Sequence, residues 1–285
     1  MGQRFVTTFE QRGYLVVPDL LSPVEIAELR DEIARICSYH AVELGVPTEM
    51  IGPDLIGRIL CVHQPHKLSD TLVDCARHPR LVEVLSGIVG PDVKCMQSQA
   101  FVKPPGFPGN AWHQDECAIP TRDQSLVAAW IALDDSTEAN GCLRVVPGTH
   151  RSGYLFPQQP HGRPEEYDFP TQCFGFDETA QLALEVTAGS VVFFHGYLVH
   201  GSRANRSNNY RRALTYHYMN AYSLLPWRIP VAPGQSEVRG AMADDRDVFL
   251  VCGSDPYAWK GYTDIVAPHL RLCHHPNAVA VYRQE

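Results

Sequence analysis

His113 and Asp115, two positions apart in Trp112-His113-Gln114-Asp115, are the first residues whose types and spacing could do chemistry. If this segment is a strand, residues i and i+2 point to the same face, so both side chains aim at one point. A neutral imidazole and a hard carboxylate make two thirds of the facial 2-His-1-carboxylate triad that binds iron(II). The pair alone is weak evidence, because a chain of this length with 13 histidines should contain about one such tripeptide by chance.

A second histidine strengthens the pattern. Residues 190–218 read as a strand, a turn that contains His200, a loop, and a second strand that opens at Arg211. If the two strands are antiparallel neighbours, His200 completes the triad and Arg211 points into the same barrel mouth. Arginine suits a buried dicarboxylate, because its planar guanidinium pairs with a carboxylate through two hydrogen bonds and stays charged.

Nearby residues offer alternatives. His195 lies sixteen rather than eleven residues before Arg211 and lacks the Gly-Ser pair that follows His200, so we expect it to be a packed histidine or the neighbour of a ligand. Arg212 cannot share the face of Arg211, since successive strand residues point in opposite directions. His217 could line the cavity or be a satisfied core histidine, and the sequence favours neither.

Several other charged or ionisable residues have simpler interpretations. Lys103, Arg144 and Arg58 are predicted surface charges, with a substrate contact as the second possibility for Arg58. His150 is expected to fix the turn that it closes. The pair His274-His275 is predicted to be solvated.

The order of the motifs resembles the phytanoyl-CoA dioxygenase family of iron(II)- and 2-oxoglutarate-dependent oxygenases. That family has HxD, then Asn-Gly-x-Leu leading to Pro-Gly-Ser/Thr-His, then His-Gly-Ser followed by Asn and Arg. The matching pieces here, besides residues 113–115, are Asn140-Gly141-Cys142-Leu143, Pro147-Gly148-Thr149-His150, His200-Gly201-Ser202, Asn205 and Arg211. The agreement extends over about residues 10–222.

The resemblance implies a fold, a reaction and a set of site residues. It implies iron(II) bound by His113, Asp115 and His200, with Arg211 on the distal carboxylate of 2-oxoglutarate. The co-substrates would be 2-oxoglutarate and O2, the products succinate and CO2, and the usual outcome hydroxylation of a small-molecule substrate. Desaturation, rearrangement, or a non-catalytic metal-binding β-barrel are the alternatives.

The same matching adds three residues to the co-substrate pocket, namely Gln99, Trp130 and Ser202. It also bears on the reaction type, because the related halogenases have a small residue where this chain has Asp115. We therefore expect an oxygenase rather than a halogenase.

The elements that must position these residues change in character along the chain. The first third is predicted to be helical, with a capping box at Ser22-Pro23-Val24-Glu25, a second helix after Ser69, and a third from Pro79 to Gly90. Short β-branched and aromatic segments separated by turn residues then follow, at 93–103, 126–133, 142–146, 190–194 and 211–219.

This pattern predicts a mainly β, α+β fold with a double-stranded β-helix (jelly-roll, cupin-like) core and flanking N-terminal helices. We expect one dioxygenase domain over 1–285. Helical support would occupy about 1–92, the β-helix core about 93–222, and a C-terminal extension with possible short helices about 223–285.

Composition restricts the partners. The net charge is −8 and no segment concentrates Lys and Arg, which argues against nucleic acid. The longest apolar run, at 191–199, is too short to cross a membrane, and the first residues lack an apolar signal core. Nine cysteines without a CxxC pair favour free thiols in a reducing compartment, so we predict a cytoplasmic location. The oligomeric state is unknown.

Residues 151–181 are expected to be a long irregular loop that covers the cavity as a lid. The segment carries two basic and five acidic residues, a balance that argues against an acyl-CoA substrate. Its aromatic side chains suit an apolar or ring-containing molecule; they are Tyr154, Phe156, Tyr167, Phe169, Phe174 and Phe176. We therefore predict a small, neutral or cationic, largely apolar substrate.

Overall fold

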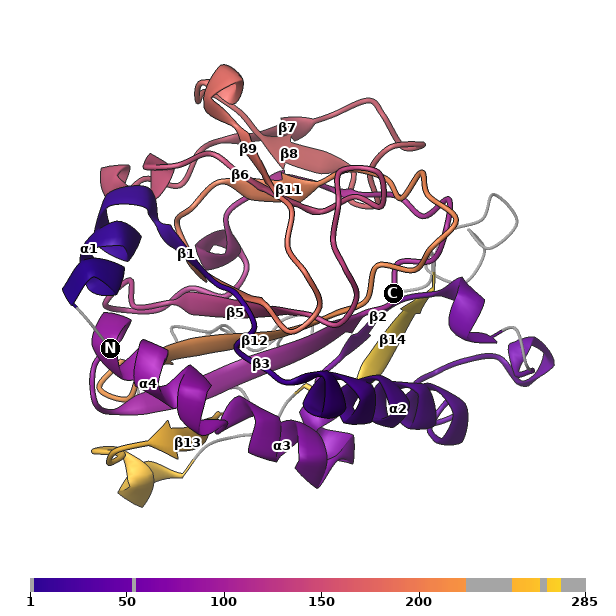
Figure 1. Ribbon diagram of the computed structural model, residues 1–285, viewed down its shortest axis with the longest axis horizontal. Helices are drawn as coiled ribbons and strands as arrows, with labels where there is room; N and C mark the ends of the chain where they lie inside the picture. The colour runs from indigo at the N-terminus through magenta and orange to yellow at the C-terminus, as the bar shows by residue number, and fades with distance from the viewer. Residues whose placement is uncertain (1–2, 53–54, 224–247, 262–265, 273–285) are drawn as a thin grey trace, which may run out of the picture.

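Two antiparallel sheets face each other in the computed structural model, which describes residues 3–52, 55–223, 248–261 and 266–272 (Figure 1). The larger sheet contains β1 (Tyr14–Val17), β2 (Ile59–His63), β3 (Val93–Phe101), β5 (Val127–Ala132), β10 (Val191–His195), β12 (Ala213–Asn220), β13 (Phe249–Cys252) and β14 (His269–Leu272). Its order is β1-β10-β5-β12-β3-β2-β14, and β13 pairs with β3 beside this path.

The smaller sheet contains β4 (Asn110–His113), β6 (Leu143–Val145), β9 (Leu182–Leu184) and β11 (His200–Ser202), in the order β4-β11-β6-β9. A separate pair, β7 (Gln158–Pro160) and β8 (Thr171–Cys173), lies in the segment 151–181. All strand pairs of the two main sheets are antiparallel. The predicted mainly β fold with a double-stranded β-helix core is confirmed.

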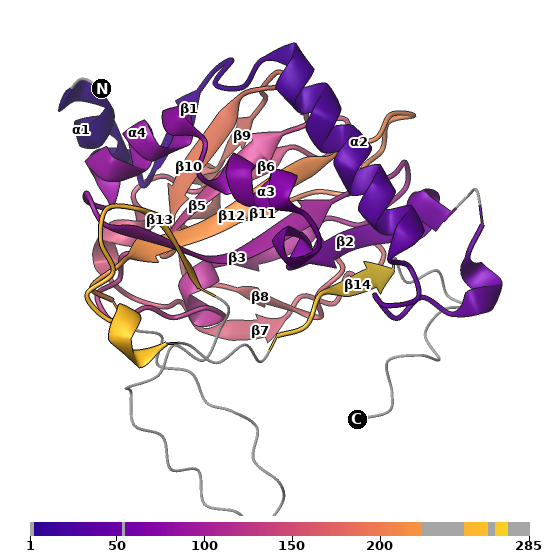
Figure 2. The same ribbon diagram turned by 90° about the horizontal axis from the view of Figure 1, so that it is seen from below.

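The α-helices of the described residues are α1 (Gln3–Arg12), α2 (Pro23–Tyr39), α3 (Asp70–Ala76) and α4 (Pro79–Ile88), and short 3₁₀ helices lie in the connecting segments. Helices α2, α3 and α4 lie along the outer face of the larger sheet, on the side away from the smaller sheet (Figures 1 and 2). Apolar side chains of these helices and of that sheet face form the main hydrophobic core. A second apolar cluster fills part of the space between the sheets.

Two of the predicted helix starts are satisfied by their side chains. Ser22 Oγ accepts from Glu25 N while Glu25 Oε2 accepts from Ser22 N at 2.7 Å, so the predicted capping box is present. Ser69 Oγ accepts from Leu72 N at the start of α3. No helix among the described residues has the length and apolar character needed to cross a membrane.

The larger sheet extends beyond the residues expected to form it. Strands β1 and β2 lie in the part predicted to be helical, and β13 and β14 lie in the part predicted to be an extension with short helices. Each has only four or five residues, too few for a clear alternation, and becomes a strand because a longer neighbour offers it hydrogen bonds. The segment 151–181 is likewise more regular than expected. His274-His275 lies outside the described residues.

Replacing Ser22 by alanine should lower the free energy of unfolding by about 1 kcal/mol, because the first turn of α2 loses its side-chain acceptor. Chemical denaturation measures this change. Ser38→Ala is the control, since the exposed Ser38 hydroxyl bonds only Ala34 O within the same helix. It should stay within about 0.5 kcal/mol of the wild type. Equal losses in the two variants would contradict a special role for the cap.

Candidate functional site

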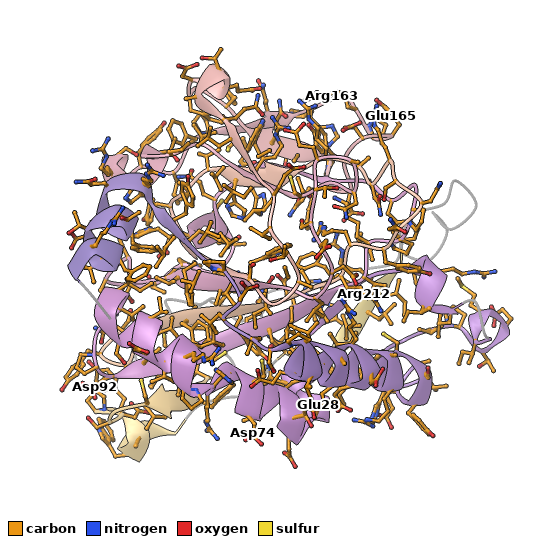
Figure 3. All side chains as sticks on the ribbon, in the orientation of Figure 1. Glu28, Asp74, Asp92, Arg163, Glu165 and Arg212 are labelled. Atoms are coloured by element: carbon orange, nitrogen blue, oxygen red, sulfur yellow. The ribbon has the colours of Figure 1, made fainter. Side chains whose placement is uncertain are left out.

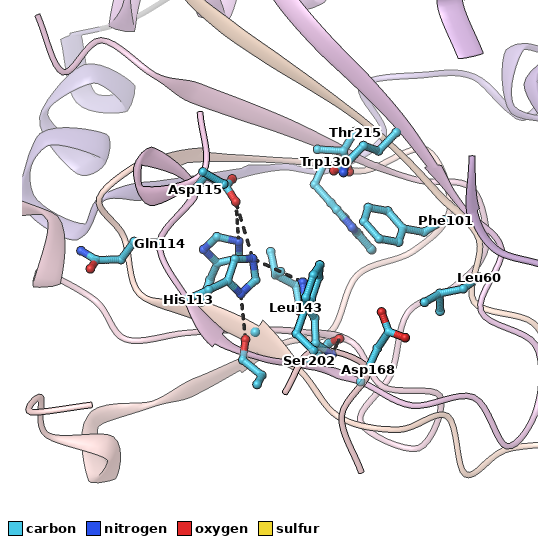
Figure 4. Close-up of a pocket in the computed structure, with 18 of the residues that line it drawn as sticks. Leu60, Phe101, His113, Gln114, Asp115, Trp130, Leu143, Asp168, Ser202 and Thr215 are labelled. Atoms are coloured by element: carbon cyan, nitrogen blue, oxygen red, sulfur yellow. Dashed lines mark hydrogen bonds and ion pairs between the residues drawn. The ribbon is translucent and has the colours of Figure 1, made fainter. Parts of the chain in front are cut away.

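A cavity of about 490 Å³ lies between the two sheets (Figure 4). Strands β3, β5 and β12 of the larger sheet and β4 and β11 of the smaller sheet contribute side chains to its wall. All seven residues predicted for the site line this cavity, namely His113, Asp115, His200, Arg211, Gln99, Trp130 and Ser202. The fold thus brings together residues more than a hundred positions apart.

Two histidines and one aspartate face one another across β4 and β11. His200 lies directly opposite His113 in the antiparallel register. Asp115 opens the short 3₁₀ helix Asp115–Cys117, and its Oδ1 lies 3.5 Å from Nε2 of each histidine (Figure 4). The three ligand atoms lie within 4.8 Å of one another, so one metal ion could contact all three.

Backbone carbonyls fix the orientation of both imidazoles. Nδ1 of His113 lies 2.7 Å from Ala111 O, and Nδ1 of His200 lies 2.9 Å from Leu198 O. A carbonyl can only accept, so each Nδ1 carries the proton and each Nε2 presents a lone pair to the space beside Asp115. Burial, followed by the nearby His113, lowers the pKa of His200 to about 4, so this ring is neutral at pH 7. Two imidazoles that present Nε2 to one point, together with a carboxylate, fit iron(II).

The second oxygen of Asp115 contacts a third histidine. His217 Nε2 lies 3.1 Å from Asp115 Oδ2, and His217 also lines the cavity, which resolves the choice that the sequence left open. Burial would raise the pKa of the Asp115 carboxyl. The electrostatic effect of the adjacent His200 and the hydrogen bonds of His113 and His217 outweigh burial and hold that pKa well below its ordinary value. Asp115 is therefore ionised.

Arg211 is a buried cation without a carboxylate partner among the described residues. Its guanidinium carbon lies 5.5 Å from the centre of the Trp130 ring, its exposed fraction is 5%, and its Nε has no hydrogen-bond partner. Burial lowers its pKa to about 10, which still leaves it charged at pH 7. Because an unpaired buried charge is costly, this arrangement fits an anionic ligand that enters the cavity.

Arg212 has a different environment from Arg211, as predicted, although β12 begins at Ala213 rather than at Arg211 and both arginines precede it. Its Nε and Nη2 each donate to the Asp134 carboxylate at 2.8 Å, and it does not line the cavity. The two neighbouring arginines thus differ in their ion pairing: Arg212 has a carboxylate partner within the protein, whereas Arg211 has none among the described residues.

Lys103 was predicted to be a surface charge, and this prediction is wrong. Its side chain lines the cavity with an exposed fraction of 2%, and Nζ donates to the carbonyls of Gly141 and Arg203 and to Ser202 Oγ. Gly141 adopts φ +77, and a Cβ there would lie 2.6 Å from this amine, so the turn needs glycine. Burial, followed by the charge of Arg211, holds the pKa of Lys103 well below its ordinary value.

Ser202 receives two hydrogen bonds on one hydroxyl oxygen. Lys103 Nζ donates to Oγ at 3.2 Å and the backbone N–H of Asn110 donates at 3.1 Å. Both lone pairs are then occupied, and the hydroxyl hydrogen is left to donate to a ligand oxygen in the cavity. The serine is therefore oriented as a donor.

The rival residues lie elsewhere. His195 does not line the cavity, and its Nδ1 accepts from Tyr197 N at 3.1 Å. His150 Nε2 bonds Glu10 O at 3.0 Å, so it joins its turn to α1. Arg58 is exposed and does not line the cavity, which contradicts a substrate contact. Arg144 was expected at the surface but is partly buried, where its Nε donates to Gln181 at 3.0 Å.

The segment 151–181 covers the cavity with a mostly polar surface. Its lining side chains are Gln158, Asp168, Phe169 and Thr171. Phe169 is the one member of the predicted aromatic set that lines the cavity, so that part of the expectation is wrong. Phe156 and Phe176 instead pack with Trp112 on the far face of the smaller sheet. Arg163 and Glu165 project from the surface of this segment (Figure 3).

The middle residue of the His-x-Asp motif holds the covering segment in place. Gln114 Nε2 donates to Tyr154 O at 2.9 Å, and Gln114 Oε1 accepts from Phe156 N at 2.7 Å. Residues 113 and 115 therefore face the metal site while residue 114 joins that site to the segment above it.

Comparison with known proteins agrees with this geometry. The sequence profile described as "Phytanoyl-CoA dioxygenase (PhyH)" matches residues 9–213. The chain belongs to the phytanoyl-CoA dioxygenase family of iron(II)- and 2-oxoglutarate-dependent oxygenases. This membership explains why the motif order, the histidine–aspartate–histidine cluster and the unpaired Arg211 occur together.

Curated relatives in this family come from animals, plants and bacteria. The peroxisomal phytanoyl-CoA dioxygenase of Bos taurus is 29% identical, with 75% of this chain and 67% of that protein aligned. Phytanoyl-CoA dioxygenase 1 of Oryza sativa is 34% identical over 74% of this chain and 86% of that protein. Ectoine dioxygenase of Bordetella parapertussis is 30% identical over 71% of this chain and 70% of that protein. The alignment thus spans about two thirds of the animal relatives' length.

Solved structures share the fold at lower identity. The epimerase SnoN, crystallised with Fe3+, alpha ketoglutarate and nogalamycin RO, superposes with a TM-score of 0.63 and 23% identity, covering 83% of this chain and 93% of SnoN. EctD from S. alaskensis, crystallised with 2-oxoglutarate and 5-hydroxyectoine, superposes with a TM-score of 0.60 and 22% identity. This superposition covers 79% of this chain and 78% of EctD. These superpositions support the double-stranded β-helix.

Replacing His113, Asp115 or His200 by alanine should each abolish iron(II) binding, because each change removes one of three converging donors. The measurement is the weak visible charge-transfer band expected when iron(II) and 2-oxoglutarate are bound without air. His195→Ala is the matched control and should keep the band. The assignment is wrong if His195→Ala loses the band while His200→Ala retains it.

Proposed function

We propose that this oxygenase binds iron(II) through His113, Asp115 and His200 and 2-oxoglutarate through Arg211, and that it oxidises a small organic molecule, most simply by hydroxylation. The observation that carries the proposal is Arg211, a buried guanidinium without an anion partner in the same cavity as the ligand triad. When bound, iron(II) would supply O2 activation coupled to conversion of 2-oxoglutarate into succinate and CO2.

The residues around Arg211 would hold the co-substrate rather than react with it. A 2-oxoglutarate carboxylate would pair with the guanidinium and accept the Ser202 hydroxyl hydrogen, which Lys103 and Asn110 N–H direct into the cavity. The Trp130 ring beside Arg211 would limit the access of water to this pair, which would strengthen the attraction between the charges.

Asp115 and its neighbours would maintain the open face of the triad. His217 occupies the second carboxylate oxygen of Asp115, leaving the first directed at the two histidines. Apolar Phe194 and Leu143 line the cavity beside them and limit the access of bulk water. A carboxylate at position 115 supports oxygenation over halogenation.

We further infer that the substrate is a small molecule rather than a CoA thioester. The cations that line the cavity have assigned partners or roles: Arg271 pairs with Asp168, Lys103 bonds Ser202, and Arg211 would hold 2-oxoglutarate. Among the cavity-lining cations of the described residues, no group remains for the phosphates of a nucleotide. The covering segment would shield the reaction from water in the manner of a lid.

A cytoplasmic location remains part of this proposal. The eight cysteines within the described residues are all free thiols, which agrees with a reducing compartment.

Replacing Arg211 by alanine should weaken 2-oxoglutarate binding by about two to four decades, because the buried carboxylate loses a partner worth about 3–5 kcal/mol. Arg211→Lys should recover part of the loss, since an ammonium cannot make the paired hydrogen bonds. Anaerobic titration of the charge-transfer band measures the affinity. Arg212→Ala is the control, because Arg212 bonds Asp134 outside the cavity. Normal binding by Arg211→Ala would refute the proposal.

Lys103→Met should lower 2-oxoglutarate affinity through Ser202, whose hydroxyl would lose one of the two donors that orient it. Ser202→Ala should have a similar effect of about tenfold. The double variant should then be little worse than either single one, because the two side chains act as one unit. Additive losses in the same titration would show that Lys103 affects binding by another route.

A further inference from the structure

Three polar side chains lie side by side across the cavity face of the larger sheet. Thr215 of β12 is opposite Gln99 of β3 in the antiparallel register, and Gln99 is opposite His63 of β2. All three line the cavity. We call Thr215, Gln99 and His63 the polar rung.

The hydrogen bond within the polar rung leaves two buried polar atoms of the rung without a partner. Gln99 Nε2 donates to His63 Nδ1 at 3.1 Å, which places the proton of His63 on Nε2. That Nε2 and Thr215 Oγ1 are both buried without a hydrogen-bond partner. Buried polar groups in native proteins are nearly always satisfied, so an unsatisfied pair on a cavity wall indicates a ligand.

The two ends of the polar rung face different parts of the cavity. At one end Thr215 is opposite Trp130, the ring that contacts Arg211, so this end belongs to the proposed co-substrate site. At the other end the His63 ring stacks on His269, with centroids 4.5 Å apart. In the sheet register His63 lies on the opposite side of Gln99 from Thr215 and Trp130, away from the end that 2-oxoglutarate would occupy. The His63 end would therefore meet the substrate.

The surroundings of His63 favour an uncharged partner. Burial, followed by the charges of His269 and Arg271, lowers the pKa of His63 to about 3, so its ring is a neutral donor at pH 7. Arg271 forms an ion pair with Asp168 of the covering segment, so these two charges compensate each other. Leu60 and Phe169 supply apolar surface in the same cavity.

We propose that His63 is a specificity-determining residue whose Nε2–H binds a neutral hydroxyl or carbonyl oxygen of the substrate. The substrate would then be a small molecule with an apolar body and an uncharged oxygen function, more polar than the sequence alone suggested. This inference rests on the proposed function, because it assigns the remainder of the cavity once 2-oxoglutarate occupies the Arg211 end.

The test uses the enzyme loaded anaerobically with iron(II) and 2-oxoglutarate, and small probes of one shape. Cyclohexanol and cyclohexanone carry the neutral oxygen, cyclohexane lacks it, and cyclohexanecarboxylate and cyclohexylammonium carry a charge. Ligand-observed NMR measures their relative affinities. The wild type should bind the two oxygen-bearing probes about tenfold more tightly than cyclohexane and more tightly than either ion.

Three variants separate the possible explanations. His63→Phe keeps the ring but removes the donor and should abolish the preference for oxygen, whereas His63→Gln should retain part of it. His195→Phe, at a histidine outside the cavity, should behave as the wild type. All should bind 2-oxoglutarate within about twofold of the wild type, which also shows that the variants are folded.

The outcomes distinguish this inference from the proposed function. A wild type that binds no 2-oxoglutarate would refute the proposed function itself. A wild type that binds 2-oxoglutarate normally but shows no probe binding, no preference for oxygen, or a preference that survives in His63→Phe would refute only the inference. A loss of 2-oxoglutarate affinity in His63→Phe alone would assign His63 to the co-substrate and would also refute it.

Discussion

The direct pairing of His200 with His113 across two short antiparallel strands is the constraint on which the site depends. Side chains on a strand alternate, so a slip of one residue would turn one imidazole away from the other. The register shifts between His200 and Ser202, and Gly201 at this irregularity permits the close approach of the strands, because a Cβ there would lie 2.8 Å from Asn110 O. The neighbouring pairing of β11 with β6 extends the same register to Val145.

A second constraint is the balance of buried charge. Within the cavity, Arg211 is a buried cation without an acidic partner, while Asp115 is surrounded by three histidines. A divalent metal beside Asp115 and a dicarboxylate beside Arg211 would together satisfy groups that the described residues leave unsatisfied. The charges of the cavity are therefore balanced best when both a metal ion and a dicarboxylate are bound.

The covering segment connects this chemistry to the rest of the fold. Gln114 holds its beginning next to the triad, the aromatic contacts with Trp112 anchor its outer part, and Asp168 joins it to β14. Because residue 114 lies between two site residues, a movement of the segment would shift the backbone that carries His113 and Asp115. These contacts hold the segment in one position over the cavity, where its composition had predicted a long irregular loop.

The sequence by itself determined the chemistry of the site. The types and spacing of His113, Asp115, His200 and Arg211 predicted one cavity. Strand alternation indicated that only one of Arg211 and Arg212 reaches it, and the eleven-residue spacing from His200 selected Arg211. The fold class and helix starts were also predictable, because capping boxes and turn residues act through neighbours in the sequence. Strand alternation could also have placed Lys103 on the cavity face, because it lies four residues after Gln99. Lys103 was instead predicted to lie at the surface.

Only the tertiary structure decided the contributions that come from distant segments. Strand β2 is too short to predict, so His63 entered the cavity through pairing with β3 rather than through any local pattern. The positions of Phe156, Phe176 and Asp168 were decided in the same way. An aromatic side chain of the covering segment can pack on the sheet or face the ligand, and composition does not distinguish these faces. Packing against Trp112 determines which face Phe156 and Phe176 take, since it buries apolar surface that would stay in contact with water in the cavity.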